Sequence, residues 1–136
     1  LSLPVYAVAT PNGANVRVCT SSRLDTGSEI VATSYNKLGN RRFLRFSVPG
    51  TRTIRINVSC PAGDADCAGT PVPDPDFVVS RAKDVTVSEA ETPRVESLNY
   101  DATAGDYVLE IYDWSHVDPN ATTRRGRTCM TVNITG

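Results

Sequence analysis

A repeated alternation of apolar and polar residues constrains the fold of this chain more than any other feature. It is clearest in the stretch AGDYVLEIYDW at 104–114, where Tyr107, Leu109 and Ile111 fall on one side and the intervening residues on the other. A period of two places successive side chains on opposite faces of an extended strand, whereas a helix requires a period of 3.6. The stretch is therefore predicted to be a strand with one buried face.

Similar short segments recur along the chain and are separated by residues that favour turns, mainly Gly, Pro, Asn and Asp. Further strands are predicted at 3–9, 15–20, 29–35, 42–48, 52–60, 77–80, 84–88, 94–99 and 127–135. No helical pattern of useful length accompanies them. Many short strands with regular turns indicate an all-β sandwich or barrel.

The length of 136 residues fits one domain, which we place at 1–136, with 1–14 as a lead-in or edge strand. A chain of this size buries about two-thirds of the surface that it exposes when unfolded, so a single core suffices. No apolar run approaches the about 20 residues that span a bilayer, and no membrane span is expected. The first residue is Leu1 rather than Met, as expected of a mature fragment or an excised domain.

The short connection at 49–51 allows a test of how its two flanking strands pair. Directly paired residues on antiparallel strands share a face of the sheet. A two-residue turn would pair Phe46 with Thr53 and mix the two faces, whereas a three-residue loop would pair Phe46 with Ile54 and preserve the apolar face. Either the loop has three residues, or the two strands belong to different sheets.

Four cysteines are present, and their spacing predicts disulfides rather than a metal site. Zinc sites use closely spaced Cys or His pairs, which this chain lacks. Cys19 and Cys129 each lie opposite the apolar face of their strand, so we predict that they are bonded across neighbouring strands. Cys60 and Cys67 are predicted to close the base of the loop at 61–75. Disulfides imply an oxidising compartment, here secreted, extracellular or periplasmic.

The charge balance disfavours nucleic acid as a partner. The chain carries 14 Lys and Arg against 15 Asp and Glu, for a net charge of -1. Phosphate binding depends on a concentrated positive surface, which this balance does not indicate.

The single histidine limits the catalytic possibilities. A nucleophile, base and orienting group would have to include His116, which lies in the sequence Ser-His-Val-Asp on a predicted loop. We predict a solvated loop histidine and assign no catalytic residue. A small hydrolase that uses His116 is kept as an alternative hypothesis.

Loop acids are the candidates for a metal. Asp64, Asp66, Asp74 and Asp76 carry oxygen atoms of the kind that Ca²⁺ prefers. The glycine and the distal glutamate of an EF-hand loop are missing. Polar loop residues are the favoured interpretation, Ca²⁺ is the minor alternative, and no other cofactor is expected.

Two aromatic residues at the end of the strongest strand are the candidates for binding. Tyr112 and Trp114 alternate onto one face, where aromatic side chains give a large contact area at low entropic cost. Outward-facing Arg45 and Arg55 are expected to flank them. In the alternative interpretation Trp114 closes the end of the core.

Four segments together resemble a known family in order and spacing: RRFLRFSVPGTRTIRINVS, DPDFVVSR, DATAGDYVLEIYD and CMTVNITG. This family is the bacterial pre-peptidase C-terminal domain, and the resemblance covers about 40–136. It implies a two-sheet antiparallel β-sandwich, jelly-roll-like, with about 8–10 strands. It also implies a non-catalytic module of a secreted peptidase that aids secretion, folding or substrate attachment.

Some relatives, the collagen-binding domains of clostridial collagenases, bind calcium through acids in an N-terminal linker and just before the first long strand. Here Arg41 and Arg42 occupy the second position, and no acid precedes Cys19. Family-type calcium binding is therefore not expected. The same relatives bind collagen through exposed aromatic residues on a sheet face, for which Tyr112 and Trp114 are the nearest candidates.

The leading hypothesis is an accessory domain that attaches a parent peptidase to an extracellular protein or polysaccharide. One alternative is a structural or chaperone-like export domain with no external ligand. Another is a carbohydrate-binding module.

Overall fold

The computed structural model describes residues 7–21, 40–90, 92–118, 120 and 125–136. Within these ranges the chain forms nine strands and one short helix. They are β1 (Ala7–Val8), β2 (Val16–Ser21), β3 (Arg41–Val48), β4 (Arg52–Ser59), β5 (Pro75–Arg81), β6 (Asp84–Ser88), β7 (Val95–Ala102), β8 (Gly105–Asp113), α1 (Trp114–Val117) and β9 (Arg127–Thr135). The strand predicted at 29–35 lies outside the described residues.

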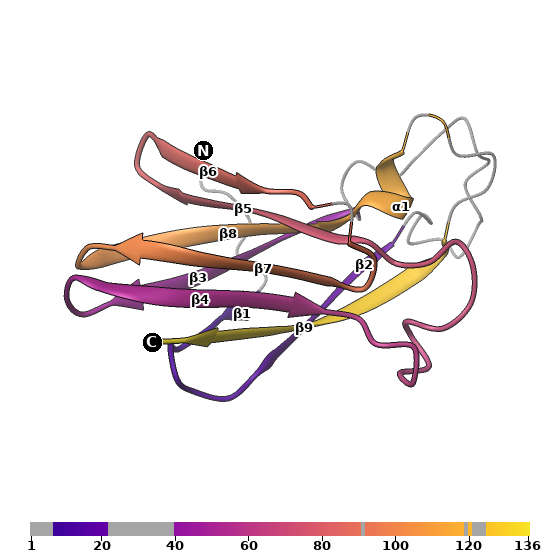
Figure 1. Cartoon of the computed structure of the whole chain (residues 1–136), viewed down its shortest axis with the longest axis horizontal. Coiled ribbons are helices and arrows are strands. Elements are labelled where there is room, and N and C mark those ends of the chain that lie inside the picture. Colours follow the sequence, from indigo (N-terminus) through magenta and orange to yellow (C-terminus); the bar gives the residue numbers. More distant parts are fainter. Residues whose placement is uncertain (1–6, 22–39, 91, 119, 121–124) are drawn as a thin grey trace.

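The strands form two stacked sheets, and their order is that of a jelly roll (Figure 1). One sheet has the order β1-β3-β8-β5-β6 and the other β2-β9-β4-β7. Among the described strands, every connection except the β5–β6 hairpin passes from one sheet to the other. All pairings are antiparallel except the short parallel pairing of β1 with β3 at the sheet edge. The predicted antiparallel jelly-roll sandwich is confirmed.

The connection at 49–51 joins strands of different sheets, which is the second of the two alternatives. β3 pairs with β8, whereas β4 pairs with β7 and β9. Phe46 therefore lies opposite Tyr107 in one sheet, and Ile54 lies opposite Tyr100 in the other. The apolar faces of β3 and β4 meet across the core rather than side by side.

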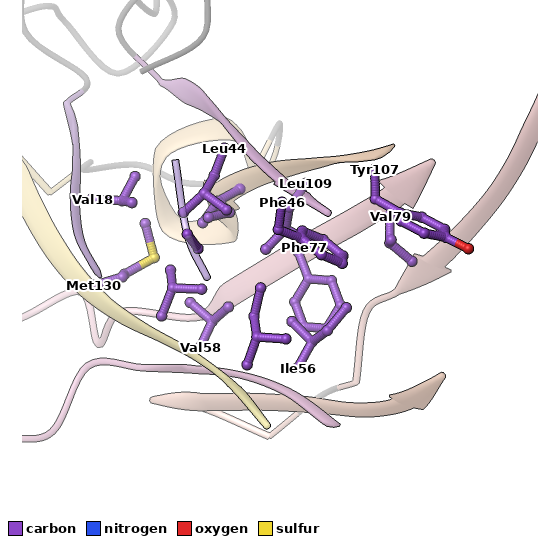
Figure 2. Packing of buried hydrophobic residues seen from close by; sticks show 14 of the residues in the cluster. Val18, Leu44, Phe46, Ile56, Val58, Phe77, Val79, Tyr107, Leu109 and Met130 are labelled. Carbon is purple, nitrogen blue, oxygen red and sulfur yellow. The ribbon is translucent and has the colours of Figure 1, made fainter. Parts of the chain in front are cut away.

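The core lies between the two sheets and contains the residues that the alternation placed inward. Figure 2 shows side chains of both sheets converging there, among them Phe46, Phe77 and Leu109 from one sheet and Ile56 and Met130 from the other. All five are at most 1% exposed. Full burial of one such side chain contributes about 1.5–3 kcal/mol to stability.

Both predicted disulfides are present. Cys19–Cys129 joins directly paired residues of β2 and β9 and closes a segment of 110 residues, whereas Cys60–Cys67 spans 7 residues at the start of the β4–β5 loop. The two bonds are neighbours, because the Sγ atom of Cys67 lies 3.1 Å from the carbonyl oxygen of Cys129. In the part of the chain that the structure describes, no helix is long and apolar enough to cross a membrane.

Candidate functional site

The candidate site begins where β8 ends and the chain turns into the single-turn helix α1. Asp113 is the N-cap of α1, and its carboxylate accepts a hydrogen bond from the backbone N–H of Ser115 at 2.9 Å. A side chain of this type satisfies N–H groups that the first turn of a helix leaves unpaired. The alternation of β8 therefore stops at Asp113. Trp114 starts a new element and is 42% exposed.

Reciprocal hydrogen bonds hold α1 against the residues that precede β5. The backbone N–H of Asp74 donates to the carboxylate of Asp113 at 2.9 Å. The backbone N–H of Trp114 donates to the carbonyl of Asp74 at 2.8 Å. Figure 1 shows α1 at the same end of the sandwich as the loop that follows β4. These contacts fix Trp114 beside the start of β5.

A pocket of about 200 Å³ lies at this junction. It is lined by Asp74 and Asp76 from the start of β5, by Glu89 and Ala90 after β6, and by Trp114. Three of the five lining residues are acidic and none is basic. The pocket therefore combines a negative potential with one aromatic side chain.

Asp76 is a buried acid in the wall of the pocket. It is 4% exposed, and its Oδ1 atom has no hydrogen-bond partner. Burial, followed by the negative charges of Asp74, Glu96 and Glu89, raises the pKa of Asp76 to about 8. Glu96 also hydrogen-bonds to Asp76 and accepts a hydrogen bond from the backbone N–H of Ala90 at 2.6 Å. In the free pocket the buried carboxyl group thus holds its proton at neutral pH.

Tyr112 differs from the prediction, because it is 4% exposed and is not displayed on the surface. It lies on the outer face of β8, where Arg41 and Glu89 cover it. The guanidinium of Arg41 lies 4.5 Å from the centre of its ring, and its hydroxyl donates to Glu89. Burial and the hydrogen bond to Glu89 raise its pKa. Tyr112 therefore supports the pocket wall, while Trp114 lines the pocket itself.

Arg45 and Arg55 are exposed, but the structure does not bring them together. Arg45 lies on β3 opposite Val108, and Arg55 lies on β4 opposite Asn99 and Thr135. Because these strands belong to different sheets, the two guanidinium groups project from opposite outer faces of the sandwich. They do not form one surface around Trp114.

The four loop acids occupy two separate environments. Asp64 and Asp66 both bind the guanidinium of Arg17, each at 2.8 Å. The hydrogen bond from Arg17 holds the pKa of Asp64 at about 2. Asp74 and Asp76 instead line the pocket beside Trp114.

A calcium site of the kind found in the clostridial relatives does not fit the residues present. Among the described residues, no group of three or more His, Cys, Asp and Glu side chains is placed to hold a metal ion. At the start of β3, Arg41 forms an ion pair with Glu110 at 2.9 Å. A guanidinium in this position opposes a cation rather than binding one.

His116 is fully buried in α1, so the prediction of a solvated loop histidine is wrong. Its Nε2 atom lies 3.4 Å from the hydroxyl of Thr128 and 3.9 Å from the carboxylate of Asp113. The hydroxyl of Thr128 donates to Asp113 at 2.6 Å. These residue types resemble a catalytic triad, but all three are 0% exposed and therefore cannot contact a substrate. The capped turn directs His116 inward, which the strand alternation did not reveal.

Arg125 completes this buried network. Its side chain is 3.9 Å from Asp113 and donates to the carbonyls of Asp66, Ala68 and Pro71 at 2.9–3.0 Å. These bonds anchor the β4–β5 loop. Arg125 was not predicted from the sequence, and neither were Glu89 and Glu96 of the pocket region. Each of them also contacts residues at least 20 positions away in the chain, namely Arg125 at Asp66, Glu89 at Tyr112 and Glu96 at Asp76, and strand alternation does not reveal such contacts.

The topology defines a jelly-roll β-sandwich with an acidic pocket at one end. No protein-family model and no curated protein matches the sequence. Among solved structures, the chain is similar to the pre-peptidase C-terminal domain of a collagenase from Bacillus anthracis. The TM-score is 0.56 at 14% identity, over 98% of this chain and 99% of that domain. The chain therefore has the fold that the sequence resemblance implied.

Proposed function

We propose that this domain is a non-catalytic accessory module of a secreted bacterial peptidase. In this proposal it attaches the parent enzyme to an extracellular protein or polysaccharide through Trp114 and the adjoining pocket. The observation that carries the proposal is the exposed indole of Trp114, held in a fixed place by the hydrogen bonds to Asp74 in a fold shared with a collagenase domain. Two disulfides suit an oxidising, extracellular location.

A non-catalytic role is supported by the position of His116. The only histidine of the chain is enclosed between Asp113 and Thr128 and has no exposed surface. A general base must approach the proton that it removes, to within hydrogen-bonding distance of the substrate. His116 instead contributes to the packing of α1 against the sandwich.

The proposal is tested by measuring binding of the isolated domain to insoluble collagen, chitin and bacterial cell wall. We expect Trp114→Ala to abolish most of the binding to whichever material retains the unmodified domain. The matched control is Val8→Ala, which removes an exposed apolar side chain from β1, at the edge of the five-stranded sheet opposite β6. If the insoluble material retains both variants equally, Trp114 is not part of the binding surface.

Arginine variants extend this test to the two outer faces. Arg45→Ala and Arg55→Ala each remove one exposed cation from a different sheet. Loss of binding in only one of them would show over which sheet the partner extends.

Deletion of the domain from its parent enzyme separates attachment from export. Normal secretion with reduced binding to the insoluble substrate supports attachment. Reduced secretion with unchanged substrate binding would favour a structural or export role.

A further inference from the structure

We propose that the pocket beside Trp114 binds the cationic side chain of a partner protein, an arginine or a lysine. This inference rests on the proposed attachment function and specifies its ligand. It makes the partner a protein with accessible basic residues rather than a neutral polysaccharide.

The chemistry of the pocket wall matches such a side chain. Asp74, Asp76 and Glu89 supply carboxyl oxygen atoms, and Trp114 supplies an aromatic face. Guanidinium and ammonium groups form their strongest hydrogen bonds with carboxylates, and cations are attracted to the face of an indole ring. A pocket of about 200 Å³ that opens beside an exposed indole admits the end of a long side chain.

One buried atom points to a missing partner. Asp76 is 4% exposed and lines the pocket, yet its Oδ1 atom has no hydrogen-bond partner. A buried polar atom without a partner costs free energy, which a donor entering the pocket would recover. The same chain shows the proposed chemistry elsewhere, since Arg17 binds Asp64 and Asp66 at 2.8 Å each.

A compact metal ion fits less well than an organic cation. Calcium requires six to eight oxygen ligands within about 2.3–2.6 Å. The described residues contain no group of three His, Cys, Asp or Glu side chains close enough to hold a metal. A guanidinium carries several donors around a plane and can therefore reach acceptors that are further apart.

The test uses the indole N–H of Trp114 as a reporter in an NMR titration, because this is the only tryptophan of the chain. The probe is the peptide acetyl-Gly-Arg-Gly-amide. The control peptide contains citrulline in place of arginine and so has nearly the same shape without the charge. A second probe has lysine in place of arginine. We expect a saturable shift of the indole N–H signal with the arginine peptide and a comparable shift with the lysine peptide. The citrulline peptide should bind at least tenfold more weakly.

Variants of the domain locate the interaction. Asp76→Asn and Trp114→Leu are each expected to weaken binding of the arginine peptide at least tenfold, whereas Trp114→Phe keeps an aromatic face and retains more. The control is Asp84→Asn, which removes one exposed negative charge at the start of β6 and should leave the affinity within twofold. Circular dichroism of each variant checks that the fold is intact.

Three outcomes overturn the inference: equal binding of the arginine and citrulline peptides, no binding of either, or binding that Asp76→Asn leaves unchanged. A parallel titration with CaCl₂ covers the metal alternative. Saturation by calcium that Asp76→Asn abolishes, without arginine binding, would assign a metal site instead.

The two proposals fail in different ways. If Trp114→Ala abolishes binding to insoluble collagen while the arginine peptide does not bind, this inference fails and the attachment function stands. If the arginine peptide binds but the domain retains no insoluble material, the attachment function fails and the pocket assignment stands.

Discussion

The raised pKa of Asp76 makes the stability of this domain depend on pH, and a single substitution should remove this dependence. An ordinary aspartate has a pKa of 3.8, whereas burial and neighbouring acids raise the pKa of Asp76 to about 8. Between these values the folded state holds a proton that the unfolded chain has released. The free energy of unfolding therefore falls as the pH rises from about 4 to about 8, and the contribution of Asp76 is constant outside that window.

The D76N variant should lack this loss, because an amide keeps the shape of the neutral carboxyl group and can donate to Glu96. A rise in pKa from 3.8 to about 8 corresponds to about 6 kcal/mol, at about 1.4 kcal/mol for each pH unit. Solvent enters the pocket beside Trp114 and screens part of this interaction, so we expect about half, or about 3 kcal/mol. The difference in unfolding free energy between variant and wild type should grow by that amount between pH 4 and pH 8.

The assay is urea denaturation followed by circular dichroism at each pH unit from 4 to 9, with the disulfides intact. The control is Asp84→Asn, an exposed aspartate outside the pocket, whose difference from the wild type should stay nearly constant. If the D76N difference also stays constant within about 0.5 kcal/mol, Asp76 titrates normally and the argument from burial is refuted.

Three further predictions concern the disulfides, the buried network and the pocket. The double variant Cys19→Ala/Cys129→Ala should lose about 5 kcal/mol of unfolding free energy in urea, since the bond closes 110 residues, and a loss below about 2 kcal/mol would contradict the chain-entropy estimate. Arg125→Met should lower the free energy of unfolding by about 3 kcal/mol, because Asp113 loses its buried cation. It should also expose the β4–β5 loop to limited proteolysis, because the hydrogen bonds to the loop carbonyls are lost, and an unchanged cleavage rate would show that Arg125 does not anchor the loop. Affinity for the arginine peptide, measured by calorimetry, should rise from pH 6 to pH 8 as Asp76 releases its proton. The same affinity at both pH values would show that the charge of Asp76 does not contribute to binding. Among the residues that the structure describes, the other ionisable groups that face Asp76 or adjoin the pocket include Asp74, Glu89, Glu96, Tyr112 and Arg41.

The strands and their buried faces were predictable from the sequence because both depend on local periodicity. In β8, Tyr107, Leu109 and Ile111 are buried as the alternation requires. The same parity placed Cys19 and Cys129 on matching faces and led to their pairing, which the structure confirms. The side on which a residue of a strand projects is fixed by its position along that strand.

The arrangement of the sheets was only partly predictable. Parity left two possibilities for the connection at 49–51, and the structure selects the one in which β3 and β4 lie in different sheets. Both arrangements bury the same apolar residues, so the choice depends on which other strands form backbone hydrogen bonds with β3 and β4. That information is spread over β7, β8 and β9.

The candidate site was predictable from the sequence only in part. The sequence singled out Trp114, Asp74 and Asp76, but it did not place them together or add Glu89. It also gave Tyr112 and His116 exposed positions, although both are buried. Alternation states which face of a strand a residue occupies, and it contains nothing about what covers that face. Local spacing along the chain was enough to predict the described strands of the core, their buried faces and the side of its strand on which each cysteine lies. The pocket could not be predicted in this way, because it forms only where the fold brings the start of β5, the end of β6 and the turn after β8 to one end of the sandwich.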